Sequence, residues 1–232
     1  MLLNPFKYRT CRVTWQDDEV MIRSYRKDHI TRSLKRGNYY EGEFLELIAQ
    51  KYATSGLFVD VGAFVGNHSV FFARNCGADH VVSFEPFPET FELLDHNIRR
   101  NNLGDNVTCV NKAVSDEHGT LTMAVVSKRN RGMNRIDSAG TTSVEVTTLD
   151  DELGESALPI TFLKIDAEGH GSNVLRGAKN IIEKFKPVIA IEVDPEPLDL
   201  ISSILIEHDY VAKSCHNATP TWIFEHASHD QH

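Results

Sequence analysis

The sequence lacks the features that would mark a secreted, disulfide-bonded or membrane-spanning protein. It has four cysteines in 232 residues and no C-x-x-C pair, so we expect reduced thiols and neither a disulfide framework nor a zinc site. No apolar run approaches the roughly 20 residues that span a bilayer. Residues 1–10 also lack the pattern of a signal peptide. We therefore expect a cytoplasmic protein without a membrane segment.

An excess of positive charge is also missing. Lys and Arg number 24 against 33 Asp and Glu, which gives a formal net charge of −9. This balance argues against broad nucleic-acid binding, which requires a basic surface. The 41% of hydrophobic and 25% of charged residues are typical of a globular protein. The length fits one large domain, or one domain with a small annex.

From residue 57 onward, apolar strand-like segments alternate with amphipathic helix-like ones. This alternation predicts an α/β fold with a doubly wound, mostly parallel seven-stranded sheet. The expected strands are 57–61, 81–84, 107–110, 161–165, 188–193, 210–214 and 221–225, and the expected helices are 67–75, 88–101, 173–185 and 198–208.

Three further segments fall outside this alternation. Residues 1–55 are expected to form an N-terminal annex with a hairpin and a helix, ahead of a ligand-binding domain at 56–226 and a polar tail at 227–232. The pattern breaks at 115–150, which predicts a β insertion after the third strand. The insertion contains a basic stretch at 128–135 that could contact an anionic acceptor.

The most informative stretch is 58–68, FVDVGAFVGNH, in which a strand leads into a helix through a turn with two glycines. Gly62 and Gly66 leave bare backbone that a ligand can approach, and the helix start offers unpaired N–H groups. The next strand ends in Glu85, 19 residues after Gly66, close to the spacing of an acid that binds ribose hydroxyls. The spacing D-x-G-x-x-x-G fits the dinucleotide fingerprint poorly.

A second polar group follows the strand at 161–165. Lys164 and Asp166 are two residues apart and therefore share one face of that strand, and a buried lysine needs a partner. Glu168 and His170 come next, at the carboxyl edge where open α/β sheets bind ligands. The alternative interpretation is a structural ion pair beside a capped helix start.

Together these motifs resemble the FkbM family of class I S-adenosylmethionine-dependent methyltransferases. The resemblance covers about residues 30–195, and its main segments are FVDVGAFVG, FEP, NKAVSD and LKIDAEG, at 58–66, 84–86, 111–116 and 163–169. It implies a Rossmann-like S-adenosylmethionine-binding domain at 56–226 and methyl transfer to a hydroxyl of a sugar or secondary metabolite. The family usually has another acid where this chain has Gly171, which leaves the catalytic base open.

This resemblance assigns roles to particular residues. Because an aliphatic hydroxyl is a poor nucleophile, a base should help to remove its proton. The candidates are Asp166 and Glu168, followed by His170. The same carboxylates could bind a divalent metal, but the ligand set is too small to predict one. The residues expected to bind the cofactor are Asp60, Gly62, Gly66, Asn67, His68, Glu85, Pro86 and Ala113.

Two other functions remain open from the sequence. One is an NAD(P)-dependent oxidoreductase, which is disfavoured because the third glycine and a Tyr-x-x-x-Lys pair are missing. The other is a non-catalytic binding subunit that retains the fold, which the loss of an acid at Gly171 keeps open. Amino-methylating enzymes carry [DN]-P-P-[YF] where this chain has DAEG, and this favours a hydroxyl acceptor. We expect a small-molecule acceptor, no nucleic-acid or membrane partner, and an undetermined oligomeric state.

Overall fold

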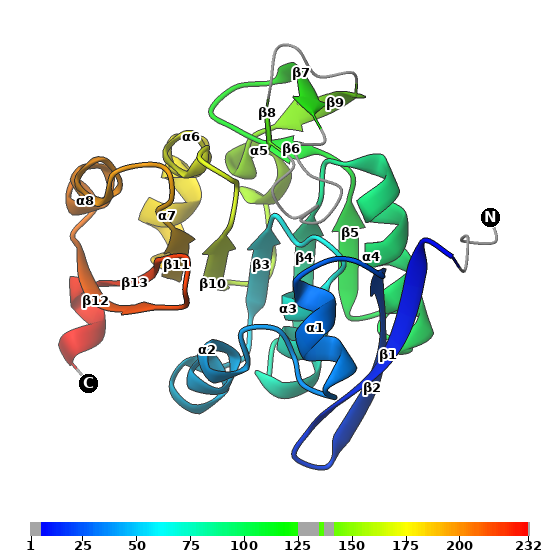
Figure 1. Ribbon diagram of the computed structural model, residues 1–232. Helices are drawn as coiled ribbons and strands as arrows, with labels where there is room; N and C mark the ends of the chain where they lie inside the picture. Colours follow the sequence, from blue (N-terminus) through cyan, green and yellow to red (C-terminus); the bar gives the residue numbers. More distant parts are fainter. Residues whose placement is uncertain (1–5, 125–134, 137–141, 232) are drawn as a thin grey trace.

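The core of the protein is a seven-stranded sheet with helices on both faces (Figure 1). The computed structural model describes residues 6–124, 135–136 and 142–231. The strand order is β12-β13-β11-β10-β3-β4-β5. The five strands from β11 to β5 are parallel to one another, and β13 is antiparallel to both its neighbours, β11 and β12. The predicted α/β class with a mostly parallel sheet is confirmed. The strands are β3 (Leu57–Val61), β4 (His80–Phe84), β5 (Val107–Val110), β10 (Ile160–Ile165), β11 (Val188–Glu192), β12 (Tyr210–His216) and β13 (Thr221–His226).

Two hydrophobic layers cover the sheet because side chains alternate along each strand. On one face, Phe58 and Phe162 stack with ring centroids 5.1 Å apart and pack against α3 and α4. On the other face, Val59 and Leu163 pack against α6, α7 and α8. This arrangement is the doubly wound one. The helices are α3 (Asn67–Asn75), α4 (Pro88–Arg100), α5 (Leu149–Leu153), α6 (Gly171–Arg176), α7 (Lys179–Phe185) and α8 (Leu198–Ile206).

The prediction of one continuous helix at 173–185 is wrong, because the structure has two helices here, α6 and α7. A Cβ on Gly177 would overlap the carbonyl oxygen of Ser115, so the chain turns here against a neighbouring loop. Asp150 then accepts hydrogen bonds from the N–H groups of Asn180 (3.0 Å) and Ile181 (2.9 Å). These bonds satisfy donors that a helix start leaves free, and α7 therefore begins as a separate helix.

The N-terminal segment packs on the face of the sheet that carries α3 and α4. Its hairpin docks through two asparagines of α4. The Asn97 side chain accepts from the N–H of Arg23 (2.8 Å) and donates to its carbonyl (2.8 Å), and Asn101 pairs with Met21 in the same way. Trp15 contacts Phe71 edge to face, so this segment shares a hydrophobic core with the sheet. Its elements are β1 (Tyr8–Trp15), β2 (Asp18–Tyr25), α1 (Ile30–Lys35), α2 (Gly42–Leu47) and a π-helical turn at Ile48–Tyr52.

The β insertion after the third strand is confirmed as a small sheet of order β6-β9-β7-β8. It lies beyond the carboxyl ends of the central strands, at the top of Figure 1. The basic stretch at 128–135 lies outside the described residues, apart from the backbone of Arg135. The strands are β6 (Ala113–Val114), β7 (Gly119–Ala124), β8 (Arg135–Ile136) and β9 (Thr142–Thr147).

The C-terminal residues, expected as a polar tail, form a 3-10 helix at Ala227–Gln231. Among the helices of the described residues, none has both the length and the apolarity to cross a bilayer.

Candidate functional site

The turn between β3 and α3 has backbone torsions that favour glycine. Gly62 has a φ of +76° and Gly66 one of +84°. A Cβ on Gly62 would overlap the carbonyl oxygen of Asp166, and one on Gly66 would lie 2.7 Å from Cδ1 of Leu94. Both glycines therefore have a packing role, and the Gly62 contact joins this turn to the loop after β10. Ligand approach to the same backbone stays a prediction.

Glu85 follows β4 directly and is only 7% exposed. Its Oε2 accepts the N–H of Phe64 (3.0 Å), and its Oε1 accepts the N–H of Phe87 (2.9 Å). Burial raises the pKa of Glu85 to about 8, although these N–H groups oppose the rise. Since a carboxylate oxygen can accept two hydrogen bonds, each oxygen keeps capacity for a ligand hydroxyl.

Pro86 and Ala113 lie on neighbouring segments of this edge. The Asn111 side chain donates to the carbonyls of Glu85 (2.8 Å) and Pro86 (3.0 Å) and so fixes the path of the chain after β4. Ala113 is buried in the small core of the insertion, which also contains Phe87. The predicted ribose site and the insertion therefore meet at Phe87.

A buried ion pair crosses β3 and β10. Lys164 and Asp60 are partners in the parallel register, with 3.2 Å between Nζ and Oδ1, while Ser69 donates to the other oxygen of Asp60 (2.7 Å). Burial alone would raise the pKa of Asp60, but the charge of Lys164 holds it below its usual value. Asp60 has no exposed surface. In the structure the Asp60 carboxylate pairs with Lys164. A contact between Asp60 and the cofactor stays a prediction.

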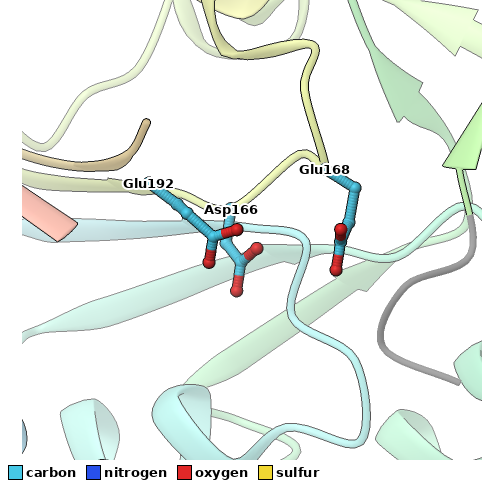
Figure 2. Close-up of side chains that lie close together, drawn as sticks. All are labelled: Asp166, Glu168 and Glu192. Carbon is cyan, nitrogen blue, oxygen red and sulfur yellow. The ribbon is translucent and has the colours of Figure 1, made fainter. Parts of the chain in front are cut away.

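Three carboxylates gather where β10 and β11 end (Figure 2). Each of Asp166, Glu168 and Glu192 has an oxygen that lies within 4.8 Å of the others. Nζ of Lys164 lies 3.6 Å from Oδ2 of Asp166. Burial, together with the charges of Asp166 and Glu168, raises the pKa of Glu192 to about 9. The site thus combines several acidic groups with one buried lysine.

These acids offer oxygen atoms of the kind that Mg²⁺ and Ca²⁺ take as ligands. Acidic groups also cluster at protein surfaces without an ion, and the three are half-buried. Nothing else among the described residues points to a cation here, and we assign none.

His170 lies apart from the three carboxylates. Its Nε2 is 2.8 Å from Oγ of Ser115, which also donates to Asp116 (2.9 Å). Asn173 donates to the same Asp116 oxygen (3.0 Å). Burial lowers the pKa of His170. The structure therefore brings together two of the three predicted catalytic residues, and it links the third to the start of the insertion.

Asn67 and His68 begin α3, and both hold the N-terminal segment in place. The Asn67 side chain accepts from the N–H of Tyr40 and donates to its carbonyl, both at 3.0 Å. His68 Nε2 lies 3.0 Å from Oε2 of Glu41. These contacts keep Tyr40 and Glu41 close enough to the acidic group for its charges to act on Tyr40 and for the charge of Glu41 to act on Glu192. Direct cofactor contacts of Asn67 and His68 stay predictions.

Gly171, where the resemblance implies an acid, lies beside Glu196 of another loop. A Cβ on Gly171 would lie 3.1 Å from Oε2 of Glu196. The Glu196 carboxylate accepts the N–H of Ser172 at 3.1 Å and 3.3 Å. A carboxylate from another loop therefore lies next to Gly171, where it binds the first turn of α6.

Comparison with known protein families covers the part of the chain that forms this site. The family model of the methyltransferase FkbM domain matches residues 60–216, which is more than half of the chain. The chain belongs to the FkbM methyltransferase family. The matched region includes the glycine turn, Glu85, the acidic group and all of β10 and β11.

Two known proteins are similar to this FkbM-family chain. The hexuronic acid methyltransferase AglP of Haloferax volcanii is 25% identical over 163 residues, covering 69% of this chain and 66% of AglP. Methyltransferase 1 of Beauveria bassiana is 25% identical over 171 residues, covering 64% of this chain and 63% of that protein. The matches thus span slightly less than two thirds of each relative.

Solved structures of methyltransferases share the fold. An FkbM methyltransferase from Methylobacillus flagellatus KT has a TM-score of 0.55 at 23% identity, over 74% of this chain and 44% of that one. A ribosomal protein L11 methylase from Lactobacillus delbrueckii subsp. bulgaricus has a TM-score of 0.52 at 12% identity, over 82% and 80%. The expected class I methyltransferase architecture is confirmed.

Sequence reasoning missed one member of the acidic group. Glu192 ends an apolar strand, as many surface acids do, and only the pairing of β10 with β11 places it beside Asp166. A signal for Glu192 existed, because an acid at the end of a parallel strand next to Asp166 must lie at the same edge.

Proposed function

We propose that this protein transfers a methyl group from S-adenosylmethionine to a hydroxyl of a small molecule, with a sugar as the favoured acceptor. The observation that carries the proposal is the double role of the β3–α3 turn. Through the Phe64 N–H it binds Glu85, and through Gly62 it packs on the backbone of Asp166. A cofactor whose ribose binds Glu85 would thus extend along this turn toward the acidic group.

The cofactor would be held by backbone and by one buried acid. Glu85 would accept the ribose hydroxyls with its remaining lone pairs, beside Pro86 and Ala113. Gly62 and Gly66 would line the path of the amino-acid part, supported from behind by Asp60, Asn67 and His68. When bound, S-adenosylmethionine supplies a methyl group on a positively charged sulfur, and the acidic surroundings favour that charge.

The acceptor would lie against the acids at the ends of β10 and β11. Asp166 and Glu168 can accept hydrogen bonds from hydroxyl groups and can take up the proton that the reacting hydroxyl loses. Holding that oxygen in line with the methyl group provides the main part of the acceleration in such a transfer. His170, which lies beside Ser115, would be the third candidate to accept this proton.

A sugar acceptor is supported by the similarity to AglP, a hexuronic acid methyltransferase. A sugar also presents several hydroxyls to several carboxylates at once. Membership in the FkbM family favours methyl transfer over the NAD(P)-dependent oxidoreductase considered from the sequence. The Glu196 carboxylate beside Gly171 weakens the case for a subunit that has lost its site.

Calorimetry with S-adenosylmethionine, S-adenosylhomocysteine and NAD tests the cofactor. We expect the first two to bind and NAD to give no heat. If neither sulfur compound binds at millimolar concentration, or if NAD binds in their place, the proposal is wrong.

The acceptor is tested by incubating the protein with isotopically methyl-labelled cofactor and a panel of sugars. The panel should contain hexuronic acids, neutral hexoses and their nucleotide-linked forms, with amines of similar size as controls. Mass spectrometry should find the label on an oxygen of a sugar. Labelled nitrogen in the amine controls, with unlabelled sugars, would contradict O-methylation.

A further inference from the structure

The ends of β10 and β11 place Asp166 and Glu192 side by side. The two strands are parallel, and their last paired residues are Ile165 and Ile191. The next residue on each strand is therefore in register, and both side chains point to the same face. Figure 2 shows the two carboxylates adjacent, with Glu168 reaching the same space from the loop.

The charges around Glu192 are mostly negative. From β10 and its loop it faces Asp166, Glu168 and the buried amine of Lys164; from the N-terminal segment it faces Glu41 and the phenol of Tyr40. Its partner on β13 is the neutral Thr221.

Lys164 cannot balance all of these acids. Its amine lies nearer to Asp60 (3.2 Å) than to Asp166 (3.6 Å), and Asp60 is buried and ionised beside it. Two neighbouring carboxylates in a half-buried site repel each other when both are charged, so one of them keeps its proton.

We propose that Asp166 and Glu192 act as a carboxyl pair that carries one proton in the resting protein and accepts the proton of the acceptor hydroxyl during methyl transfer. The second part of this proposal, proton uptake during methyl transfer, rests on the proposed function. As the oxygen–methyl bond forms and the sulfur–methyl bond breaks, the ionised member of the pair takes the hydroxyl proton. The pair then releases this proton to water. The proton held by Glu192 can hydrogen-bond to the ionised member of the pair and hold it in position, so that one carboxylate is free to act as the base.

The resting half of the proposal is tested without any acceptor. The protein is labelled with ¹³C at the side-chain carboxyl carbons of Asp and Glu, and the resonances are followed from pH 4 to pH 10. The Glu192 resonance, assigned by its loss in E192Q, should titrate well above the usual range of glutamate, which lies near about 4.3. D166N should lower that midpoint by at least about one pH unit, because it removes the neighbouring charge, and E168Q should lower it less. E207Q, which changes an exposed glutamate at the end of α8, should leave it unchanged.

A Glu192 midpoint in the ordinary acid range, or one that is the same in D166N, would overturn the proposal. If D166N does not fold, the wild-type midpoint and the E168Q shift decide the matter. The titration is repeated with excess EDTA and with Mg²⁺. A midpoint that rises when EDTA removes a cation would show that an ion, not a proton, occupies the pair, and would also overturn it.

The catalytic half is tested with the acceptor that mass spectrometry identifies. D166N should lower kcat by at least about tenfold, and E192Q should displace the pH–rate profile, while the Kd for S-adenosylhomocysteine of both variants stays within twofold of wild type. E207Q should match wild type in all three. An unchanged kcat in D166N, or an unchanged pH profile in E192Q, would overturn this half. A protein that fails to bind S-adenosylhomocysteine contradicts the proposed function instead, and the carboxyl titration still decides whether the pair exists.

Discussion

Lys164 and Asp60 face each other across β10 and β3, with 3.2 Å between Nζ and Oδ1, and neither is more than 3% exposed. Burial alone would lower the pKa of Lys164, but the charges of Asp60 and Asp166 keep it above its ordinary value. The lysine is therefore a fixed positive charge beneath the acidic group.

Replacing Lys164 by methionine should destabilise the fold strongly. The change leaves Asp60 buried without its counter-ion, and removal of one partner from a buried pair costs about 3–5 kcal/mol. Urea denaturation should show this loss for K164M. The exposed lysine of α7, in K179M, serves as the control and should cost little.

The double variant D60N/K164M separates the charge from the packing. It should be more stable than the sum of the two single variants predicts, because the second change removes the charge left unpaired by the first. Strict additivity would mean that the two groups do not interact in the folded protein.

Glu85→Ala should weaken the binding of S-adenosylhomocysteine. Each hydrogen bond contributes about 0.5–1.5 kcal/mol net, so the loss of two bonds to the ribose should raise Kd by roughly 5-fold or more. Calorimetry measures the change, and E92A, on the exposed side of α4, is the control. A Kd equal to that of wild type would remove Glu85 from the ribose site.

The parts of the site that the sequence predicts are those formed by local pattern. Gly62, Gly66 and Glu85 follow from a strand, a turn and a second strand at fixed spacing, and the alternation of apolar segments predicts the sheet that aligns them. The pairing of Lys164 and Asp166 on one strand face is equally local, since it depends only on a period of two.

The remaining parts depend on contacts between distant segments. Glu192 joins the acidic group through the pairing of β11 with β10, and His170 turns to Ser115, which is 55 residues away in sequence. The break at Gly177 depends on the backbone of Ser115. No periodicity within a single segment encodes these contacts, so they required the structure.

Stability should fall with pH because of Glu192. A carboxyl group whose pKa rises to about 9 on folding binds its proton more tightly in the native state than in the unfolded state, whose pKa is near about 4.3. Between these values the folded protein loses stability as pH rises, by at most about 1.4 kcal/mol per pH unit for one proton. Solvent at this half-buried position reduces the slope.

E192Q removes this group, so the variant should be increasingly more stable than wild type from pH 5.5 to pH 8.5. Urea denaturation at several pH values measures the difference, with E207Q as the control. A difference that stays constant across this range would show that Glu192 has the same proton affinity in both states.

The N-terminal segment should loosen when its anchor on α3 is removed. Asn67 makes two hydrogen bonds to the backbone of Tyr40, each with a net contribution of about 0.5–1.5 kcal/mol. N67A should therefore increase amide hydrogen exchange around Tyr40 and Glu41 while exchange in β3 and β10 stays slow. The matched control is N38A, which changes an exposed asparagine of the same segment. Because Glu41 lies among the charges that act on Glu192, N67A should also lower the Glu192 titration midpoint. Faster exchange without a change in that midpoint would separate the anchoring of this segment from the electrostatics of the site.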